Sequence, residues 1–240
     1  MEMAVVMVRL DKYLADMGIG TRTEVKKYIR QGKVKVDGIV IKTPEMKIDV
    51  NLQEVLCMEQ PVVYEEFEYY MLNKPAGVIS ATTDERDKTV IDLITNKKRD
   101  DLFPVGRLDK DTEGLLLITN DGDLAHRLLS PKKHVDKVYY AKVKGVVTKE
   151  DAKKFAEGLS IGQGEMAKPS NLEILVSDEI SEIKLTIQEG KFHQVKRMFA
   201  SVGKEVVYLK RLSMGSLVLD EQLELGTYRP LTRKELEDLC

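Results

Sequence analysis

The sequence predicts an α+β protein with two domains, a small one over residues 7–58 and a larger one over residues 67–240. Two helical patterns and a strand–turn–strand pattern fall within the first fifty residues. Residues 59–66 hold a proline and several acids, a composition typical of a linker. In the longer part, apolar runs suited to buried strands alternate with amphipathic patterns suited to helices. Because both patterns occur in each part, we expect an α+β architecture in both domains.

Composition limits the class of protein. The chain has 240 residues and a formal net charge of −2, so any surface that binds nucleic acid must be locally basic. Cys57 and Cys240 predict free thiols in a reducing compartment rather than a disulfide framework. The stretch Met1–Met7 lacks the basic start of a signal peptide, and no apolar run approaches the length of a membrane span. We therefore expect a soluble cytoplasmic protein with no membrane partner.

The small domain begins with two predicted helices. Leu10 and Leu14 lie on one face of the first helix, which ends at the glycines that follow. Thr21 can cap the second helix, with Glu24 as the partner of a capping box. Residues 34–40 then alternate as a strand, a turn and a strand. The order of elements is therefore helix, helix, hairpin.

A local excess of positive charge distinguishes this domain. Residues 8–50 contain ten Lys or Arg and six Asp or Glu. Arg22, Lys26 and Arg30 are spaced by four residues, which places them in one stripe on the second helix. Such a stripe is compatible with a solvated helix face and equally with a surface that contacts phosphates.

The larger domain is organised around a polar loop, residues 106–114, which has a glycine at each end. The apolar run Leu115–Ile118 follows directly and predicts a buried strand that would hold the loop rigidly. Within the loop, Asp109 lies two residues after Arg107, a cation that can keep the carboxylate ionised. Asp109 is therefore the first candidate for a reactive side chain.

This loop is open to three other interpretations. The first is an ordinary polar loop. A calcium loop matches Asp109, Asp111 and Gly114, but Asn120 stands where a bidentate glutamate is required and the following run predicts a strand. A glycosidase would need a second carboxylate across a sugar, and Asp111 is too near in sequence to show that geometry. We therefore expect no metal site.

Further segments predict elements of the larger domain. Residues 123–129 predict a helix, and residues 138–143 alternate as a strand that carries Tyr139 and Tyr140 on opposite faces. Residues 193–202 predict a helix with cations near its start. Thr232 can cap a short final helix.

Four segments together resemble RNA pseudouridine synthases, most closely the branch that modifies ribosomal RNA and has a small N-terminal RNA-binding domain. They occur in family order and the resemblance covers nearly the whole chain. The segments are Met71-Leu72-Asn73-Lys74-Pro75-x-Gly77, Gly106-Arg107-Leu108-Asp109 with Thr112-x-Gly114-Leu115-Leu116-Leu117-x-Thr119-Asn120-Asp121-Gly122, Lys137-Val138-Tyr139, and Glu189-Gly190-Lys191-Phe192-His193-Gln194-Val195-Lys196-Arg197-Met198.

The resemblance implies a fold and a set of site residues. The small domain would be an alpha-L RNA-binding domain, the type named after a small-subunit ribosomal protein, and the larger domain would hold a mixed, mainly antiparallel sheet. The implied catalytic residues are Asp109, Tyr139, Lys196 and Arg107, with Leu108 beside them; many relatives carry arginine where this chain has Lys196. The implied RNA-binding residues are Arg9, Lys12, Arg22, Lys26, Arg30, Lys74, Lys133, Lys137, His193 and Arg197.

The implied reaction isomerises a flipped uridine to pseudouridine without a cofactor, with Asp109 as the carboxylate that attacks. Among relatives, the resemblance is strongest to the enzyme that acts on small-subunit ribosomal RNA. We therefore expect the RNA substrate to be part of a partly assembled ribosomal particle and the enzyme to be a monomer. Two alternatives are a sister enzyme that acts on large-subunit ribosomal RNA and a non-catalytic RNA-binding assembly factor. The joint presence of Asp109, Tyr139 and Lys196 argues against the second alternative.

Overall fold

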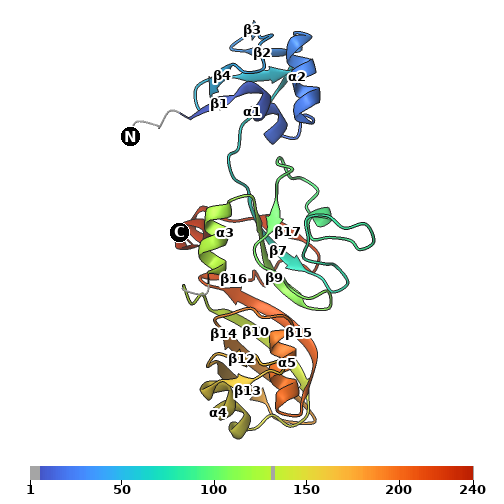
Figure 1. Ribbon diagram of the computed structural model, residues 1–240, viewed down its shortest axis with the longest axis vertical. Coiled ribbons are helices and arrows are strands. Elements are labelled where there is room, and N and C mark those ends of the chain that lie inside the picture. Colours follow the sequence, from blue (N-terminus) through green and yellow to red (C-terminus); the bar gives the residue numbers. More distant parts are fainter. Residues whose placement is uncertain (1–5, 131–132, 240) are drawn as a thin grey trace. The chain divides into compact units, whose positions relative to one another are not determined.

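The computed structural model describes residues 6–130 and 133–239 (Figure 1). The start of the chain and Cys240, on which two of the expectations above fall, lie outside these ranges. The chain divides into two compact units. The first runs to Glu68 and includes Asn96–Leu102, and the second comprises Tyr69–Thr95 and the chain from Phe103 onward. No helix in the described part of the chain has both the length and the apolar character needed to cross a bilayer.

The first unit contains two helices packed on short strands. Helix α1 packs against α2, strand β1 pairs with β4, and the remaining strands form a sheet in the order β3-β2-β5-β6. The elements are β1 (Met7–Arg9), α1 (Leu10–Asp16), α2 (Arg22–Arg30), β2 (Val34–Val36), β3 (Ile39–Val40), β4 (Lys47–Asp49), β5 (Val55–Cys57) and β6 (Gln60–Pro61).

The core of this unit follows the predicted helical faces. Leu10 and Leu14 of α1 are fully buried against Val25 and Ile29 of α2. The predicted capping box is confirmed. The Glu24 backbone N–H donates to the Thr21 hydroxyl at 3.3 Å, and the Thr21 N–H donates to the Glu24 carboxylate at 2.8 Å. Local sequence signals therefore account for this part of the fold.

The segment expected as a linker, residues 59–66, belongs instead to the first unit. Strand β6 pairs with β5, Val62 is buried, and the Tyr13 hydroxyl donates to the Val62 carbonyl. The ring of Tyr64 lies against that of Tyr13, with centroids 5.0 Å apart. These contacts order the segment, because it completes the small core.

A second segment joins the same unit from a distant part of the sequence. The Glu68 carboxylate accepts the backbone N–H groups of Lys98 and Arg99, at 3.1 and 2.9 Å. The Arg99 side chain is only 4% exposed and forms an ion pair with Asp101 at 2.6 Å. Residues 96–102 are therefore held by buried polar contacts, which the sequence pattern of this segment does not predict.

The second unit is built on a mixed, mainly antiparallel sheet. Among the described residues, this sheet has nine strands in the order β13-β14-β10-β15-β9-β7-β17, with β16 added to β15 and β8 added to β9. Of the strand pairs in this described sheet, only β15–β9 is parallel. The elements are β7 (Tyr69–Lys74), η1 (Ile91–Leu93), β8 (Phe103–Pro104), β9 (Glu113–Thr119), α3 (Gly122–Leu129), β10 (Lys137–Lys144), α4 (Lys149–Glu157), β11 (Leu159–Ser160), β12 (Met166–Ala167), β13 (Asn171–Val176), β14 (Ile180–Ile187), α5 (Gln194–Ser201), β15 (Glu205–Met214), β16 (Leu217–Val218), β17 (Tyr228–Pro230) and α6 (Arg233–Leu239).

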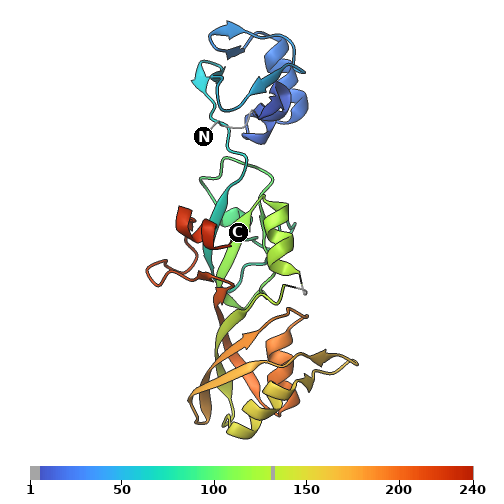
Figure 2. The ribbon, with the colours of Figure 1, turned by 90° about the vertical axis from the view of Figure 1, so that its left-hand side faces the viewer.

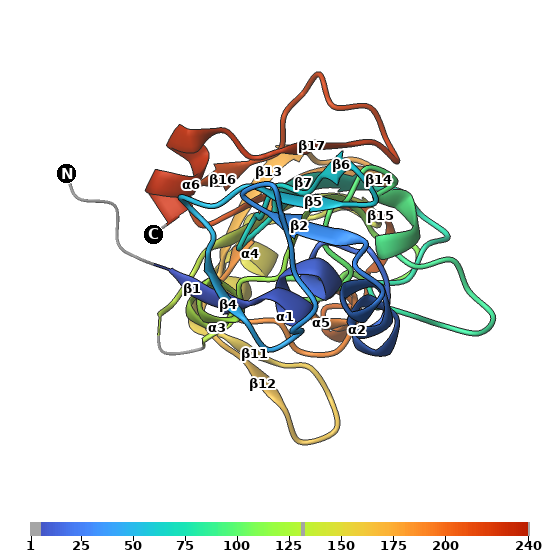
Figure 3. The ribbon, with the colours of Figure 1, turned by 90° about the horizontal axis from the view of Figure 1, so that it is seen from above.

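Helix α3 packs on the sheet beside the apolar middle of strand β9. Leu115 to Ile118 are fully buried, as the sequence predicts, and Leu124 and Leu128 of α3 pack in the same core. Further along the sheet, α4 and α5 lie on one side (Figure 2). The rings of Phe155 on α4 and Phe199 on α5 are 5.0 Å apart. The β11–β12 hairpin extends outward beside them (Figure 3).

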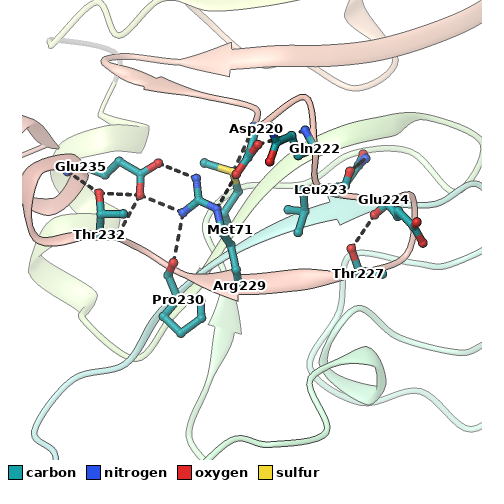
Figure 4. A network of polar contacts seen from close by, with 11 residues as sticks. Met71, Asp220, Gln222, Leu223, Glu224, Thr227, Arg229, Pro230, Thr232 and Glu235 are labelled. Carbon is teal, nitrogen blue, oxygen red and sulfur yellow. Dashed lines mark hydrogen bonds and ion pairs between the residues drawn. The ribbon is translucent and has the colours of Figure 1, made fainter.

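The C-terminal segment is fastened to β7 by a polar network (Figure 4). Arg229 of β17 donates to Asp220 at 2.8 Å and forms a two-pronged pair with Glu235, at 2.8 and 2.9 Å. The guanidinium lowers the pKa of Glu235 to about 2. Glu235 also completes the predicted cap with Thr232, whose hydroxyl accepts the Glu235 N–H at 3.2 Å. Because β17 pairs with β7, this network supports the strand that ends at Lys74.

Candidate active site

The loop that carries Asp109 enters β9 at a glycine that no other residue can replace without strain. Gly114 has a φ of +99°, and a Cβ there would lie 2.3 Å from the carbonyl oxygen of Arg211. This close approach is where β9 pairs with β15. The backbone contact fixes the loop relative to the centre of the sheet.

Lys74 holds the same loop from inside. Its side chain is fully buried, and its ammonium group donates to the carbonyl oxygens of Pro75, Asp109 and Thr112 at 3.0, 3.1 and 2.8 Å. Burial lowers the pKa of Lys74 to about 8, against the opposing charge of Asp111. The structure contradicts the expected RNA contact of Lys74, because its donors are taken up by backbone carbonyls beneath the loop.

The carboxylate of Asp109 faces two basic side chains. Lys196 Nζ lies 3.2 Å from Oδ2, and His193 Nε2 lies 3.6 Å from Oδ1. Lys196 comes from α5 and also donates to Asp111 Oδ1 at 2.6 Å. Burial acts to lower the pKa of Lys196, but the bond to Asp111 and the charge of Asp109 outweigh it and raise the pKa. The hydrogen bond from Lys196 in turn lowers the pKa of Asp111. A charged ammonium group is therefore held beside Asp109.

Arg107 does not have the position expected of it. The side chain is exposed, and among the described residues the ion pairs of Asp109 are with Lys196 and His193. Arg107 lines the cavity above Asp109 without pairing with it. The physical reason is the tight turn, in which the Asp109 carbonyl accepts the Thr112 N–H at 3.0 Å and the carboxylate points to α5.

Tyr139 completes the wall of the cavity. It is 7% exposed on β10, opposite Arg211 of β15, while Tyr140 on the other face contacts the ring of Tyr208. A cavity of about 60 Å³ is lined by Asp109, Tyr139 and Lys196, together with Arg107 and Leu108. The structure thus brings all four expected catalytic residues to one place. A larger cavity of about 410 Å³ shares Asp109 and Tyr139 and reaches His193.

Two of the expected RNA-binding cations near this site are occupied within the protein. Arg197 donates to the carbonyl oxygens of Ile161, Gly162 and Phe192, at 2.9, 3.0 and 3.2 Å, so it fastens loops in place of the expected phosphate contact. Lys137 is buried, and burial together with the charge of Arg211 lowers its pKa. Lys133 is exposed.

Sequence reasoning did not find Arg211. It is 2% exposed and its Nε donates to the Leu115 carbonyl at 2.8 Å, while its Nη2 has no hydrogen-bond partner in the described structure. In the sequence it stands beside Lys210, so the local pattern gives no signal that its side chain is buried. The pairing of its strand with both β9 and β10 is what places it beside the loop and Tyr139.

The five expected RNA-binding cations of the first unit differ in their partners. Arg9 forms a two-pronged pair with the buried Asp11, at 2.8 and 3.0 Å, and Lys26 lies 3.7 Å from the same carboxylate. Lys12 pairs with Asp16. Arg22 and Arg30 of α2 are exposed. Of the stripe formed by Arg22, Lys26 and Arg30, Lys26 is therefore oriented by an acidic partner, and both arginines are exposed to solvent.

The arrangement does not support the calcium alternative. No cluster of three or more potential metal ligands occurs among residues 6–130 and 133–239. The two carboxylates of the expected loop already share the Lys196 ammonium group, and a strand follows the loop where a helix would be required.

Residues 68–201 match the family model described as RNA pseudouridylate synthase, and residues 8–53 match that of the S4 domain. The chain belongs to the RNA pseudouridylate synthase family. The pseudouridine synthase is therefore an isomerase with an N-terminal S4 domain, as the sequence predicts.

The synthase is similar to curated relatives over its whole length. It is 52% identical over 95% of the chain to an uncharacterized RNA pseudouridine synthase of Bacillus subtilis, of which 97% is covered. It is 41% identical to ribosomal small subunit pseudouridine synthase A of Haemophilus influenzae, over 97% of the chain and 99% of the relative. It is 39% identical to ribosomal large subunit pseudouridine synthase B of Bacillus subtilis, over 97% and 96%. A crystal structure of a pseudouridylate synthase superposes with a TM-score of 0.68 at 40% identity, over 97% of this chain and all of that one.

Proposed function

We propose that this synthase isomerises a uridine of small-subunit ribosomal RNA, with Asp109 as the reacting carboxylate. The observation that carries the proposal is the shared cavity of Asp109, Tyr139 and Lys196, in which the carboxylate lies 3.2 Å from an ammonium group. A carboxylate in a partly enclosed cavity can attack a substrate carbon or stabilise a cationic sugar.

The reaction needs no oxidant or added group. The bond from ribose C1′ to uracil N1 breaks, and a bond from C1′ to uracil C5 forms. A proton leaves C5 and N1 gains one, so atoms and electrons balance. In the proposed roles, Asp109 acts on the reacting centre, Lys196 and His193 hold its carboxylate, and Tyr139 packs against the base. Arg107, which is exposed at the rim, contacts RNA rather than Asp109.

The substrate must be extruded from folded RNA before it reaches Asp109. The first unit supplies phosphate contacts through Arg22 and Arg30, and the second unit carries the chemistry. Phosphate contacts of this kind position RNA without reading its bases. We propose that the enzyme acts as a monomer in the cytoplasm on a partly assembled ribosomal particle, without a cofactor.

The relatives favour the small-subunit substrate only narrowly. The small-subunit enzyme of Haemophilus influenzae is 41% identical to this chain, and the large-subunit enzyme of Bacillus subtilis is 39% identical. A map of the modified positions in both RNAs distinguishes the two substrates.

The test is a map of pseudouridine in both ribosomal RNAs from cells that lack the protein. We expect loss of pseudouridine at one position of small-subunit RNA, restored by the wild-type chain and not by Asp109→Asn. Loss of a pseudouridine from large-subunit RNA would overturn the proposed substrate but would leave the proposal of a pseudouridine synthase intact. No loss in either RNA, with RNA binding preserved, would favour a non-catalytic assembly factor.

A further inference from the structure

Phe192 exposes an apolar ring at the edge of the larger cavity. It is 71% exposed, whereas Phe67 is 42% exposed and Phe155 and Phe199 are fully buried. A single exposed apolar side chain is common and carries no conclusion alone. The contacts of Phe192 are what indicate a function for its exposed ring.

The ring of Phe192 is stacked on the ring of the next residue. The centroids of Phe192 and His193 are 3.8 Å apart and the ring planes are 19° from parallel. In an extended chain, neighbouring side chains point to opposite faces. His193 has a φ of +46°, a left-handed conformation that non-glycine residues seldom adopt, and this turn lets the two rings lie together.

The strained turn is held by hydrogen bonds rather than left loose. Arg197 donates to the Phe192 carbonyl at 3.2 Å and to the Ile161 carbonyl at 2.9 Å. The Lys191 N–H donates to the Gln194 side chain at 2.9 Å, which closes the turn from the other side. Backbone strain that the surroundings maintain in this way is typical of functional sites.

The stacked pair lies directly beside the reacting carboxylate. His193 Nε2 is 3.6 Å from Asp109 Oδ1, and both rings line the cavity of about 410 Å³. Phe192 therefore lines the same cavity as the reacting carboxylate. Among the described residues, the cations of this cavity that reach the surface are Arg107, Lys110 and Lys191, and Asp109 is its one carboxylate. This excess of cations suits a polyanionic strand.

We propose that the Phe192–His193 pair is a stacking platform for the nucleobase next to the uridine that enters the catalytic cavity. The proposal rests on the proposed function, because it takes RNA as the substrate. Extrusion of a uridine breaks the stacking of its neighbours, and an aromatic ring restores one stacking partner. His193 covers one side of the Phe192 ring, and the ring's exposed surface remains for the base. Stacking of this kind accepts any base, because each has a π-face.

The binding test uses two single-stranded oligoribonucleotides, each with one uridine. In one the fluorescent base 2-aminopurine lies on the 5′ side of the uridine, and in the other it lies on the 3′ side. Stacking quenches this fluorophore. We expect wild-type protein to quench one of the two oligonucleotides, which also shows the side from which the neighbouring base comes.

The matched variants separate stacking from other effects. Phe192→Ala should lose the quenching and bind the oligonucleotide about 5- to 150-fold more weakly, the range for loss of one base–aromatic stack. Phe192→Tyr keeps a planar ring and should retain both. Phe67→Ala removes an exposed ring outside the cavity and should behave as wild type. Because Phe192 is exposed, its variants should melt at the wild-type temperature.

A second readout is single-turnover conversion of small-subunit ribosomal RNA. The Phe192→Ala variant should need more enzyme to reach half of the maximal rate, and Phe192→Tyr should restore the wild-type value. Unchanged quenching in Phe192→Ala would overturn the proposal, and so would wild-type affinity of Phe192→Ala for both oligonucleotides. If quenching depends on Phe192 while the wild type modifies no ribosomal RNA, the platform stands and the proposed function fails.

Discussion

Replacement of Lys74 by methionine tests how the loop that carries Asp109 is held. The variant loses three bonds from Lys74 Nζ, to the carbonyls of Pro75, Asp109 and Thr112, and a longer bond to the Lys110 carbonyl at 3.4 Å. At about 1.5–3 kcal/mol for each of the three shorter bonds from a charged donor, this loss costs about 4–9 kcal/mol of stability. Removal of a buried charge acts the other way. The pKa of Lys74 falls from 10.5 to about 8, which corresponds to about 3 kcal/mol at pH 7.

Because the lost bonds outweigh the relief of the buried charge, we expect the melting temperature of Lys74→Met to fall by several degrees at pH 7. The loop also loses its internal ties, so Asp109 should be held less well in its reactive position. We therefore expect the single-turnover rate to fall by about tenfold or more, since small displacements of reacting groups cost about that much or more.

The pH dependence of the free energy of unfolding tests the burial of Lys74 independently, because its direction can be predicted. Below pH 8, Lys74 is charged in the folded and in the unfolded protein. Between about pH 8 and 10.5 it is charged only in the unfolded protein, which then binds more protons. The free energy of unfolding contributed by Lys74 therefore rises with pH through this window. The Lys74→Met variant should lack that rise.

The assay compares urea unfolding of wild type and variant at pH 7 and at several values up to pH 10, beside the single-turnover rate. Lys88→Met, at an exposed position, is the control and should match wild type in both. Hydrogen exchange of the amides of residues 109–112 should be faster in Lys74→Met alone. The reasoning is refuted if Lys74→Met keeps the wild-type rate, or if the stability of the two proteins changes in parallel with pH.

Three further predictions concern other parts of the chain. Asp109→Asn should fold and bind RNA nearly as wild type does but form no pseudouridine in a single-turnover assay; near-normal turnover would exclude Asp109 as the reacting carboxylate. The double variant Arg22→Glu, Arg30→Glu should bind RNA more weakly when affinity is measured at several salt concentrations. The slope of log affinity against log salt concentration should become shallower by about 0.7–0.9 for each phosphate that the protein no longer neutralises. Arg233→Glu on α6 should leave both the affinity and the slope unchanged. Gly114→Ala should lower the free energy of unfolding by about 2–5 kcal/mol in urea denaturation, because its Cβ would overlap β15; unchanged stability would contradict this close approach.

The sequence alone determined the features that depend on residues close together in the chain. The capping boxes begun by Thr21 and Thr232 join residues three positions apart, and the buried run Leu115–Ile118 follows from its apolar composition. Alternation along β10 placed Tyr139 and Tyr140 on opposite faces. The family followed from motifs, because their residue types and order are properties of the chain itself.

Tertiary structure decided which polar partners those residues have. Lys74 meets the Thr112 carbonyl across 38 residues, and Lys196 meets Asp111 across 85, so neither contact has a local signature. For the same reason the sequence favoured Arg107, the near neighbour, as the partner of Asp109, while the fold supplies His193 from α5's N-terminal boundary. Residues 59–66 joined the first unit because Val62 fills a core formed by α1 and α2. Local pattern identifies the reactive loop, and long-range packing selects the charges that surround it.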